Sequence, residues 1–178
     1  MARAKSKRRP AKTQDAIALL KADHRQVEKW FKEFEKARTD GRKLELATDI
    51  CNALKVHTTI EEEIFYPAFI RATRDADLHH EAVIEHDAAR KLIAEIEASS
   101  PEDDYYDARV KVLSEMIKHH VKEEEQAGGM FAEARKSDMD LATLGAQMKA
   151  RKQELMNGAS GGTPRSRKSK ASEAQLNA

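Results

Sequence analysis

Histidines and glutamates recur in the sequence at spacings that would let them meet around a metal ion. His57 and His120 are each followed by a glutamate four residues later, which places both side chains on one helix face, about 6 Å apart. Imidazole nitrogen and carboxylate oxygen together suit iron, zinc and other first-row metals, whereas calcium and magnesium prefer all-oxygen sites. A carboxylate can also bridge two metals. The candidate ligands are His24, His57, Glu61, His86, His120 and Glu124.

These candidates stand where helical periodicity requires inward-facing side chains. His24 fills the gap in an apolar stripe that runs from Ile17 to Phe34 in steps of three and four residues. His57 lies seven residues after Ile50, and His86 and His120 lie seven residues from other apolar positions. The two glutamates follow His57 and His120 by four residues, so they share the same face. We therefore expect all of them to face the core of a helical protein.

A single histidine on an apolar face is more often a hydrogen-bonded core residue than a metal ligand. Four such histidines on four helices, with two glutamates one turn away, change that balance. Buried ionised carboxylates without partners cost several kcal/mol each, and imidazole nitrogens also need partners. A bound multivalent cation would satisfy all of these carboxylates and imidazoles at once.

The composition favours long helices, with 40% hydrophobic and 35% charged residues but only 7 Gly and 4 Pro. A chain of 178 residues fits one domain with tails. We predict an all-α protein, an up-down-up-down four-helix bundle over residues 13–135. An additional amphipathic helix is expected over 137–156, and disordered basic tails over 1–12 and 157–178.

Four long helices make up the predicted bundle. The first starts near Thr13 or Asp15 and stops before Gly41, the next two cover 43–70 and 75–98, and the last ends at Gly128-Gly129. Short connections make neighbouring helices antiparallel, and this arrangement brings the candidates of the first three helices level along the bundle axis.

The fourth helix needs a longer connection than its sequence signals suggest. If the helix started at Pro101, His120 and His86 would be displaced from each other by roughly 10 Å along the bundle axis, at a rise of 1.5 Å per residue. We therefore predict that the loop extends to about Tyr106.

Charge and cysteine content exclude several other classes. A net charge of +1 gives no reason to expect nucleic acid or an anionic membrane as an obligate partner, and no pattern points to a protein partner. The chain has no apolar run of about 18 residues and no secretory signal pattern, so we expect a cytoplasmic protein. The single cysteine, Cys51, can form neither an internal disulfide nor a thiolate site alone.

Four short segments together resemble the hemerythrin-like (HHE) cation-binding domain family. They are Asp23-His24, the run from His57 through Glu61 to Tyr66-Pro67, Glu85-His86, and His120 to Glu124-Glu125. The resemblance covers roughly residues 14–135, and its most specific piece is the run over 57–67.

The resemblance implies a helical bundle that holds non-heme iron, two ions per chain, and binds or senses dioxygen, nitric oxide or redox state. It implies that His24 and His57 serve one iron and that His86 and His120 serve the other. Glu61 and Glu124 would bridge them, which completes the ligand set.

One position departs from the oxygen-carrying members of the family, which have a second histidine four residues before the one aligned with His86. Here that position is Ala82. His79 shares the face but lies about 10 Å away along the axis. The second iron is then open to water or substrate, which favours sensing, nitric oxide binding or peroxide chemistry over oxygen transport.

The register of the fourth helix stays open in the sequence. His119 and Glu123 also have the four-residue spacing, and Glu125 instead of Glu124 could supply the bridge.

Three functional hypotheses follow. The first is a non-heme iron protein for a small diatomic ligand, and the second is an iron-dependent oxidoreductase acting on nitric oxide or peroxide. Oxidation of stored iron fits less well, since ferritin-like sites are carboxylate-rich and use Glu-x-x-His pairs. The third is a metal-free helical interaction module whose basic tails contact nucleic acid.

Overall fold

The structure is a computed structural model that describes residues 14–160. Within them the chain forms seven α-helices and one π-helical turn. In chain order they are α1 (Ala16–Lys36), α2 (Asp40–Ile60), η1 (Glu61–Phe65), α3 (Tyr66–Thr73), α4 (Ala76–Glu97), α5 (Tyr106–Glu125), α6 (Met130–Lys136) and α7 (Leu141–Ser160). The tail predicted over 1–12, and that over 157–178 beyond residue 160, lie outside the described residues.

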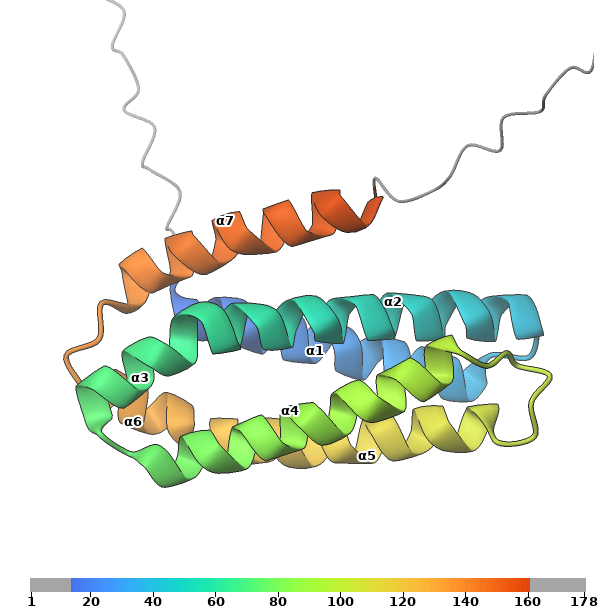
Figure 1. The fold of residues 1–178 in the computed structure, drawn as a ribbon, viewed down its shortest axis with the longest axis horizontal. Coiled ribbons are helices and arrows are strands. Elements are labelled where there is room, and N and C mark those ends of the chain that lie inside the picture. Colours follow the sequence, from blue (N-terminus) through green and yellow to red (C-terminus); the bar gives the residue numbers. More distant parts are fainter. Residues whose placement is uncertain (1–13, 161–178) are drawn as a thin grey trace, which may run out of the picture.

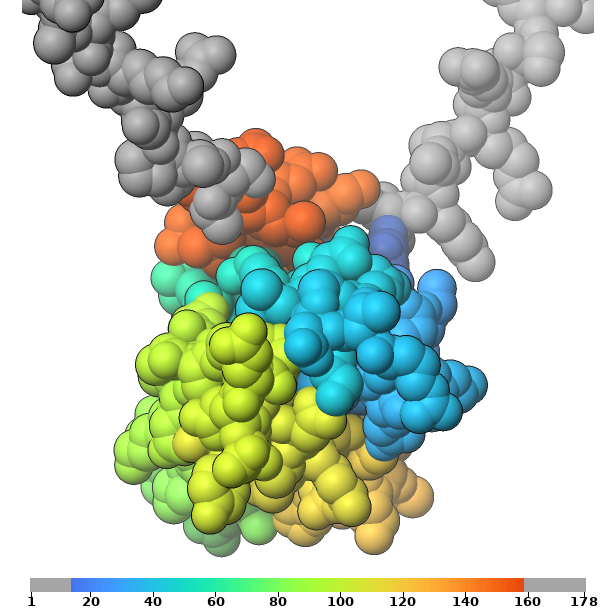
Figure 2. All heavy atoms as spheres, turned by 90° about the vertical axis from the view of Figure 1, so that its right-hand side faces the viewer, coloured from blue at the N-terminus to red at the C-terminus, as the bar shows by residue number. Residues whose placement is uncertain are grey.

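The helices α1, α2, α4 and α5 run in alternating directions along the bundle axis, which is horizontal in Figure 1. In the end-on view α1 lies beside α2, α4 lies beside α5, and α7 covers the α1–α2 side (Figure 2). The predicted all-α, up-down-up-down bundle with an additional helix is therefore confirmed.

Short polar side chains begin three of these helices. Asp15 accepts a hydrogen bond from the Ala18 amide at the start of α1, and Thr39 accepts one from the Arg42 amide at the start of α2. Asp75 does the same at the start of α4. Because Thr39 caps α2, Gly41 lies inside its first turn.

The long connection predicted before the fourth helix is also present. Residue Ala98 ends α4, and α5 begins at Tyr106, as the levelling of His86 and His120 requires. Tyr106 is buried at this end of the bundle and packs near Phe34.

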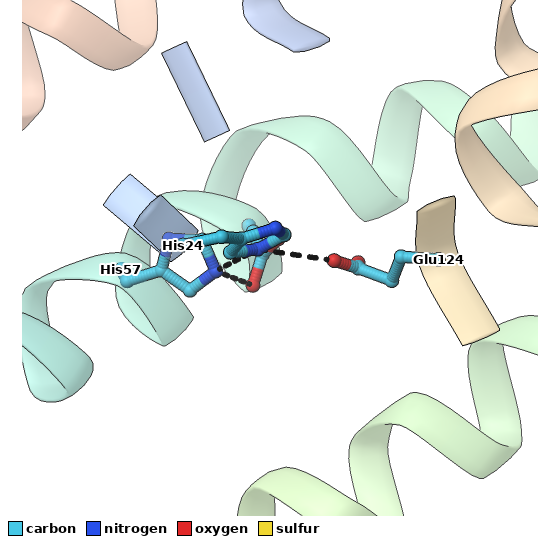
Figure 3. A group of neighbouring side chains, drawn as sticks. His24, His57 and Glu124 are labelled. Carbon is cyan, nitrogen blue, oxygen red and sulfur yellow. Dashed lines mark hydrogen bonds and ion pairs between the residues drawn. The ribbon is translucent and has the colours of Figure 1, made fainter. Parts of the chain in front are cut away.

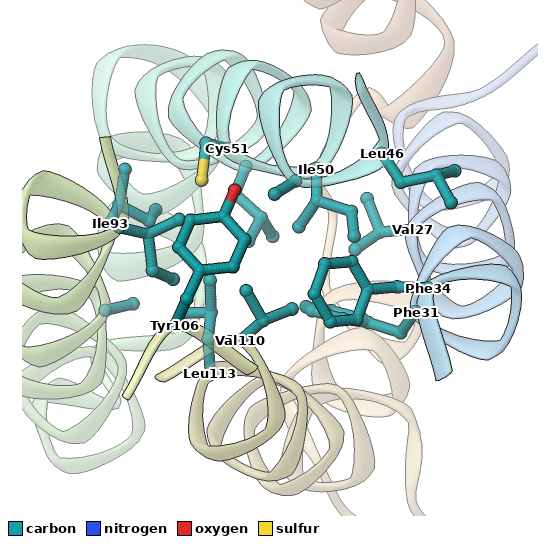
Figure 4. Packing of buried hydrophobic residues seen from close by; sticks show 14 residues of the cluster. Val27, Phe31, Phe34, Leu46, Ile50, Cys51, Ile93, Tyr106, Val110 and Leu113 are labelled. Carbon is teal, nitrogen blue, oxygen red and sulfur yellow. The ribbon is translucent and has the colours of Figure 1, made fainter. Parts of the chain in front are cut away.

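Two separate apolar clusters fill the bundle, one toward each end. The first apolar cluster (Figure 4) consists of Val27, Phe31, Phe34, Leu46, Ala47, Ile50, Cys51, Leu54, Ala89, Ile93, Ile96, Tyr106, Val110 and Leu113. The second apolar cluster consists of Ala16, Ile17, Leu19, Leu20, Ile60, Phe65, Tyr66, Phe69, Ala82, Met130, Phe131, Ala134 and Met148. In α1, α2 and α4 the candidate histidine stands between residues of the two clusters, and in α5 His120 follows Leu113 of the first cluster, so a polar layer separates the two clusters.

The predicted unbroken helix over 43–70 is wrong in one detail. At η1 the amide of Tyr66 donates to the carbonyl of Glu61, five residues earlier, which inserts one extra residue into the turn. Phe65 and Tyr66 therefore take the fully buried positions, while Ile64, which an α-helical period predicts for the core, is only partly buried.

The end of the chain differs from the sequence prediction as well. Met130–Lys136 forms a separate short helix, α6, and the additional helix expected over 137–156 occupies Leu141–Ser160. Gly145 of α7 meets the start of α1, where a Cβ atom would lie 2.6 Å from the carbonyl oxygen of Gln14. This close approach requires glycine and docks α7 on the bundle.

Candidate metal centre

Four buried side chains meet in the polar layer and form a first group of candidate ligands (Figure 3). Nε2 of His24 in α1 lies 3.1 Å from Nε2 of His57 in α2 and 3.4 Å from Oε2 of Glu124 in α5. Nε2 of His57 lies 3.2 Å from Oε2 of Glu61. One nitrogen or oxygen of each residue lies within 4.8 Å of the others, a grouping that could hold a metal ion.

A second group shares Glu61 with the first. Nε2 of His86 in α4 lies 3.5 Å from Oε2 of Glu61 and 3.3 Å from Nε2 of His120 in α5. Oε2 of Glu124 lies 3.7 Å from Nε2 of His120, so this carboxylate also reaches both groups. The structure thus brings all six candidate residues together, and each is at most 5% exposed.

Each histidine faces a second carboxylate on its Nδ1 side. In three of them Nδ1 lies 2.8 Å from a carboxylate oxygen. The pairs are His24 with Glu125, His86 with Glu62, and His120 with Glu85. A carboxylate in this position fixes the ring orientation and makes the imidazole a better metal ligand.

The fourth outer carboxylate is Asp23, whose Oδ2 lies 3.7 Å from Nδ1 of His57. Asp23 is also paired with Lys152 of α7. The helix α7, for which the sequence suggested no chemical role, therefore contacts the surroundings of a candidate ligand.

The four outer contacts form a closed ring around the bundle. Each carboxylate is the chain neighbour of a candidate ligand but serves the histidine of the next helix. The contacts run from α1 to α2, from η1 to α4, from α4 to α5 and from α5 back to α1.

The Nδ1 contacts leave Nε2 lone pairs facing each other. When Nδ1 of His86 and Nδ1 of His120 donate to their carboxylates, both Nε2 atoms are acceptors, only 3.3 Å apart. Two nitrogens that each lie about 2.1 Å from one metal, at roughly right angles, are separated by about 3 Å. With both imidazoles neutral, as metal ligands must be, these two nitrogens therefore fit one metal ion.

Unsatisfied buried oxygens give an independent test of that fit. Within the described residues, both carboxylate oxygens of Glu61 and Oε2 of Glu124 are buried and accept no hydrogen bond of good geometry, although histidine nitrogens are close. Burying such oxygens unpaired costs free energy, and a bound cation would remove that cost.

The pKa values of residues in the polar layer also indicate that the buried carboxylates lack a neighbouring positive charge. Burial and the neighbouring Glu61 carboxylate raise the pKa of Glu124 to about 8, and burial together with His57 lowers the pKa of His24 to about 4. Burial alone would lower the pKa of His57 and of His120, yet the adjacent Glu61 and Glu124 carboxylates raise them to about 10 and about 9. Protons on these two imidazoles thus supply charge where a metal ion would.

Tyr66 is a residue of the centre that the sequence reasoning did not single out. Its hydroxyl oxygen lies 3.2 Å from Nε2 of His86 and donates to Oε1 of Glu124 at 3.4 Å. Ala82, buried at the position of the missing histidine, belongs to the same apolar cluster as the Tyr66 ring. The extra residue in η1 turns Tyr66 inward, and an α-helical period cannot predict this.

The structure shows where the residues of the alternative ligand assignments lie. Glu124 lies among the Nε2 atoms, whereas Glu125 contacts Nδ1 of His24. His119 is exposed, and His79 packs its ring against Tyr66 outside both groups. Glu62 is partly buried and contacts His86 and Arg90, so it also lies beside a candidate ligand.

The outer carboxylates had a signal in the sequence. Each of them stands directly beside a candidate ligand, as in Asp23-His24, Glu61-Glu62, Glu85-His86 and Glu124-Glu125. Such doublets on an inward stripe would have identified them.

No helix in the described part of the chain combines the length and the apolarity needed to cross a membrane.

Among curated proteins, the chain is 27% identical over 117 residues to a protein named DNA nickase from Nostoc sp. (strain PCC 7120 / SAG 25.82 / UTEX 2576). The match covers 66% of this chain but 32% of that protein, so the chain spans about a third of its length.

A solved structure has the same fold. It is a hemerythrin HHE cation-binding domain-containing protein from Mycobacterium kansasii, with a TM-score of 0.68 and 22% sequence identity. The similarity covers 83% of this chain and 90% of that one. Residues 15–131 also match the model of the hemerythrin HHE cation-binding domain family, a stretch that contains every candidate ligand. This chain therefore belongs to the hemerythrin HHE cation-binding domain family.

Proposed function

We propose that this chain is a non-heme di-iron protein that binds or senses a small diatomic ligand, dioxygen or nitric oxide. His24 and His57 would hold one iron ion, His86 and His120 the other, and Glu61 and Glu124 would lie between them. The observation that carries the proposal is the convergence of four imidazole Nε2 atoms on two buried carboxylates, of whose four oxygens three accept no hydrogen bond within the described residues.

The two sides of the centre are unequal, and this inequality supports ligand binding. The first group contains four candidate ligands and the second contains three, because Glu124 lies with the first group and Ala82 adds no ligand to the second. Bound iron supplies a redox-active Lewis acid, to which a diatomic molecule can coordinate. On the second side the Tyr66 hydroxyl lies 3.2 Å from Nε2 of His86 and would donate a hydrogen bond to such a ligand in place of Glu124.

The chain's own residues also control access and water at the centre. The aromatic rings of Phe131 and Tyr66 stack on His24 and His86. Such packing keeps bulk water away from the polar layer and strengthens the electrostatic interactions inside it.

Metal analysis of the purified protein tests this proposal. We expect about two iron ions per chain, an oxo-iron absorption band after exposure to air, and a spectral change when nitric oxide is added under anaerobic conditions. His57→Ala should remove iron from the first group, whereas the exposed-residue control His80→Ala should keep it. Protein that carries no iron and folds equally well after chelation would instead indicate a metal-free helical interaction module.

The Tyr66 hydroxyl also favours a second candidate, an oxidoreductase acting on peroxide or nitric oxide. A buried phenol beside Glu124 can move a proton to or from a reacting molecule. Steady-state assays with hydrogen peroxide and with nitric oxide separate the two candidates, because a sensor binds its ligand without turnover. Multiple turnovers that Tyr66→Phe suppresses would favour the enzyme.

A further inference from the structure

Three side chains on the outer surface of α4 and α5 form another group of possible metal ligands. Nε2 of His119 lies 3.2 Å from Oε1 of Glu123 and 3.5 Å from Oε1 of Glu85. One ligand atom of each residue lies within 4.8 Å of the others. The His119 side chain is 62% exposed, so a dissolved ion can reach the group.

The charges around this group favour a cation. Within the described residues, the ion pairs of Glu123 and Glu85 are with His119 and His120, and none is with lysine or arginine. Two carboxylates and one imidazole suit a first-row divalent metal ion.

Glu85 connects the outer group to the buried centre. Its Oε1 faces His119, while its Oε2 lies 2.8 Å from Nδ1 of His120. One carboxylate thus touches both the surface group and a histidine proposed to hold iron.

A small cavity lies beneath the same carboxylate and gives a second, independent observation. Its volume is about 10 Å³, close to the room that one water molecule needs. Its lining residues are Leu78, Glu81, Ala82, Glu85, His120, Glu123, Glu124 and Met130. Glu124 is 2% exposed and its Oε2 accepts no hydrogen bond within the described residues. The cavity therefore lies between the outer glutamates and the buried Glu124 carboxylate, beside the small side chain of Ala82.

We propose that Glu85, His119 and Glu123 bind a divalent transition-metal ion at the surface, and that ferrous iron passes from there to the His86–His120 side of the centre. Side-chain movement around Ala82 must open the small cavity during this passage. The transfer step rests on the di-iron function proposed above, whereas binding at the surface does not. The ordinary alternative is a surface ion pair between His119 and Glu123 that holds no metal.

Titration with Zn²⁺, followed by calorimetry on the iron-loaded protein, tests the surface site. The test variant is His119→Ala with Glu123→Gln, which leaves Glu85 in contact with His120. The matched control, His80→Ala with Glu115→Gln, removes the same residue types from exposed positions on α4 and α5. We expect wild type and control to bind one more Zn²⁺ than the test variant. Equal stoichiometry in all three proteins would overturn the surface site.

The same comparison works when the protein holds no iron. Zn²⁺ can then occupy the buried centre as well, but the difference between control and test variant still counts the surface site. Failure of the di-iron proposal is seen as missing iron in wild type, and failure of the surface site as a missing difference between variants.

Iron uptake tests the transfer step. Chelated protein is mixed with Fe²⁺ under anaerobic conditions, and protein-bound iron is measured against time. We expect the test variant to load several-fold more slowly than the control, with the same final iron content and the same thermal midpoint. Equal loading rates would refute the passage through this site.

Discussion

Nδ1 of His86 lies 2.8 Å from Oε1 of Glu62, in a contact that joins α4 to η1. The same carboxylate oxygen accepts a hydrogen bond from Arg90 at 2.8 Å, which holds it in place from the solvent side. Glu62 therefore fixes the orientation of a histidine proposed to bind iron, although it lies outside both ligand groups.

Glu62→Gln should weaken metal binding on the second side by about 10–100-fold, because the imidazole loses the carboxylate that orients it and increases its basicity. Iron retention against a competing chelator measures this change. The neighbouring Glu63→Gln is the matched control, since Glu63 faces outward and pairs with Arg151. Equal retention in both variants would contradict the orienting role.

Tyr66→Phe should keep two bound iron ions but lower the affinity for nitric oxide, because it removes only the hydroxyl group near His86. The lost hydrogen bond to Glu124 should cost roughly 1 kcal/mol in the free energy of unfolding. Urea denaturation and anaerobic nitric oxide titration measure the two effects. Loss of iron from the variant would show that Tyr66 holds the metal itself.

Cys51 should resist alkylation in the folded protein. The thiol is buried, and burial, together with Glu97, raises its pKa to about 12 from an ordinary value of 9.0. Iodoacetamide at about pH 8.5 should therefore label the chain only after urea is added, as mass spectrometry can detect. Rapid labelling without urea would show that this part of the first apolar cluster opens readily.

The same thiol predicts how stability depends on pH in the alkaline range. A pKa that is higher in the folded state means that the unfolded chain loses its proton first. The contribution of Cys51 is then fully present below pH 9.0 and is lost as the pH rises toward 12. Cys51→Ala should show a smaller loss of stability over that range in urea denaturation.

Leu113→Ala should destabilise the protein by roughly 2–5 kcal/mol, because Leu113 is fully buried in the first apolar cluster. Iron content should not change, since this residue lies two turns before His120. The adjacent Val112 is 48% exposed, so Val112→Ala should alter stability by no more than about 0.5 kcal/mol. Denaturant titrations of the two variants give the comparison.

Removal of the metal should lower the thermal midpoint. With ligand at a hundred times its dissociation constant, binding stabilises the folded state by about 2.7 kcal/mol. For a chain of this size that corresponds to roughly 5–10 °C. Scanning calorimetry before and after chelation measures the shift, and an unchanged midpoint would mean that the buried carboxylates need no cation.

Spacing along the sequence predicted that the candidate ligands face one another in the core, because they lie on long, regular helices. An i, i+4 pair such as His57 and Glu61 shares a face whatever the rest of the chain does. The level of His86 against His120 even predicted the loop that ends at Tyr106. These predictions needed only the rise and the period of an α-helix.

The remaining features depend on departures from that regularity. The one-residue insertion at η1 moves the buried position from Ile64 to Phe65 and brings Tyr66 to His86, and a constant period misses both. Only the fold shows that Glu62 of η1 lies beside His86 of α4. The short helix α6 was missed because seven residues carry too little periodicity to predict.

The ring of carboxylate–histidine contacts has a consequence for how the helices can move. Each of the four long helices is tied to both of its neighbours at one height, so none can slide along its axis without breaking a contact on each side. An axial displacement of one helix by one turn, as occurs in some allosteric transitions, would require the contacts on both of its sides to break together. A conformational response to ligand binding is therefore more readily carried by rotation or bending of the helices than by sliding.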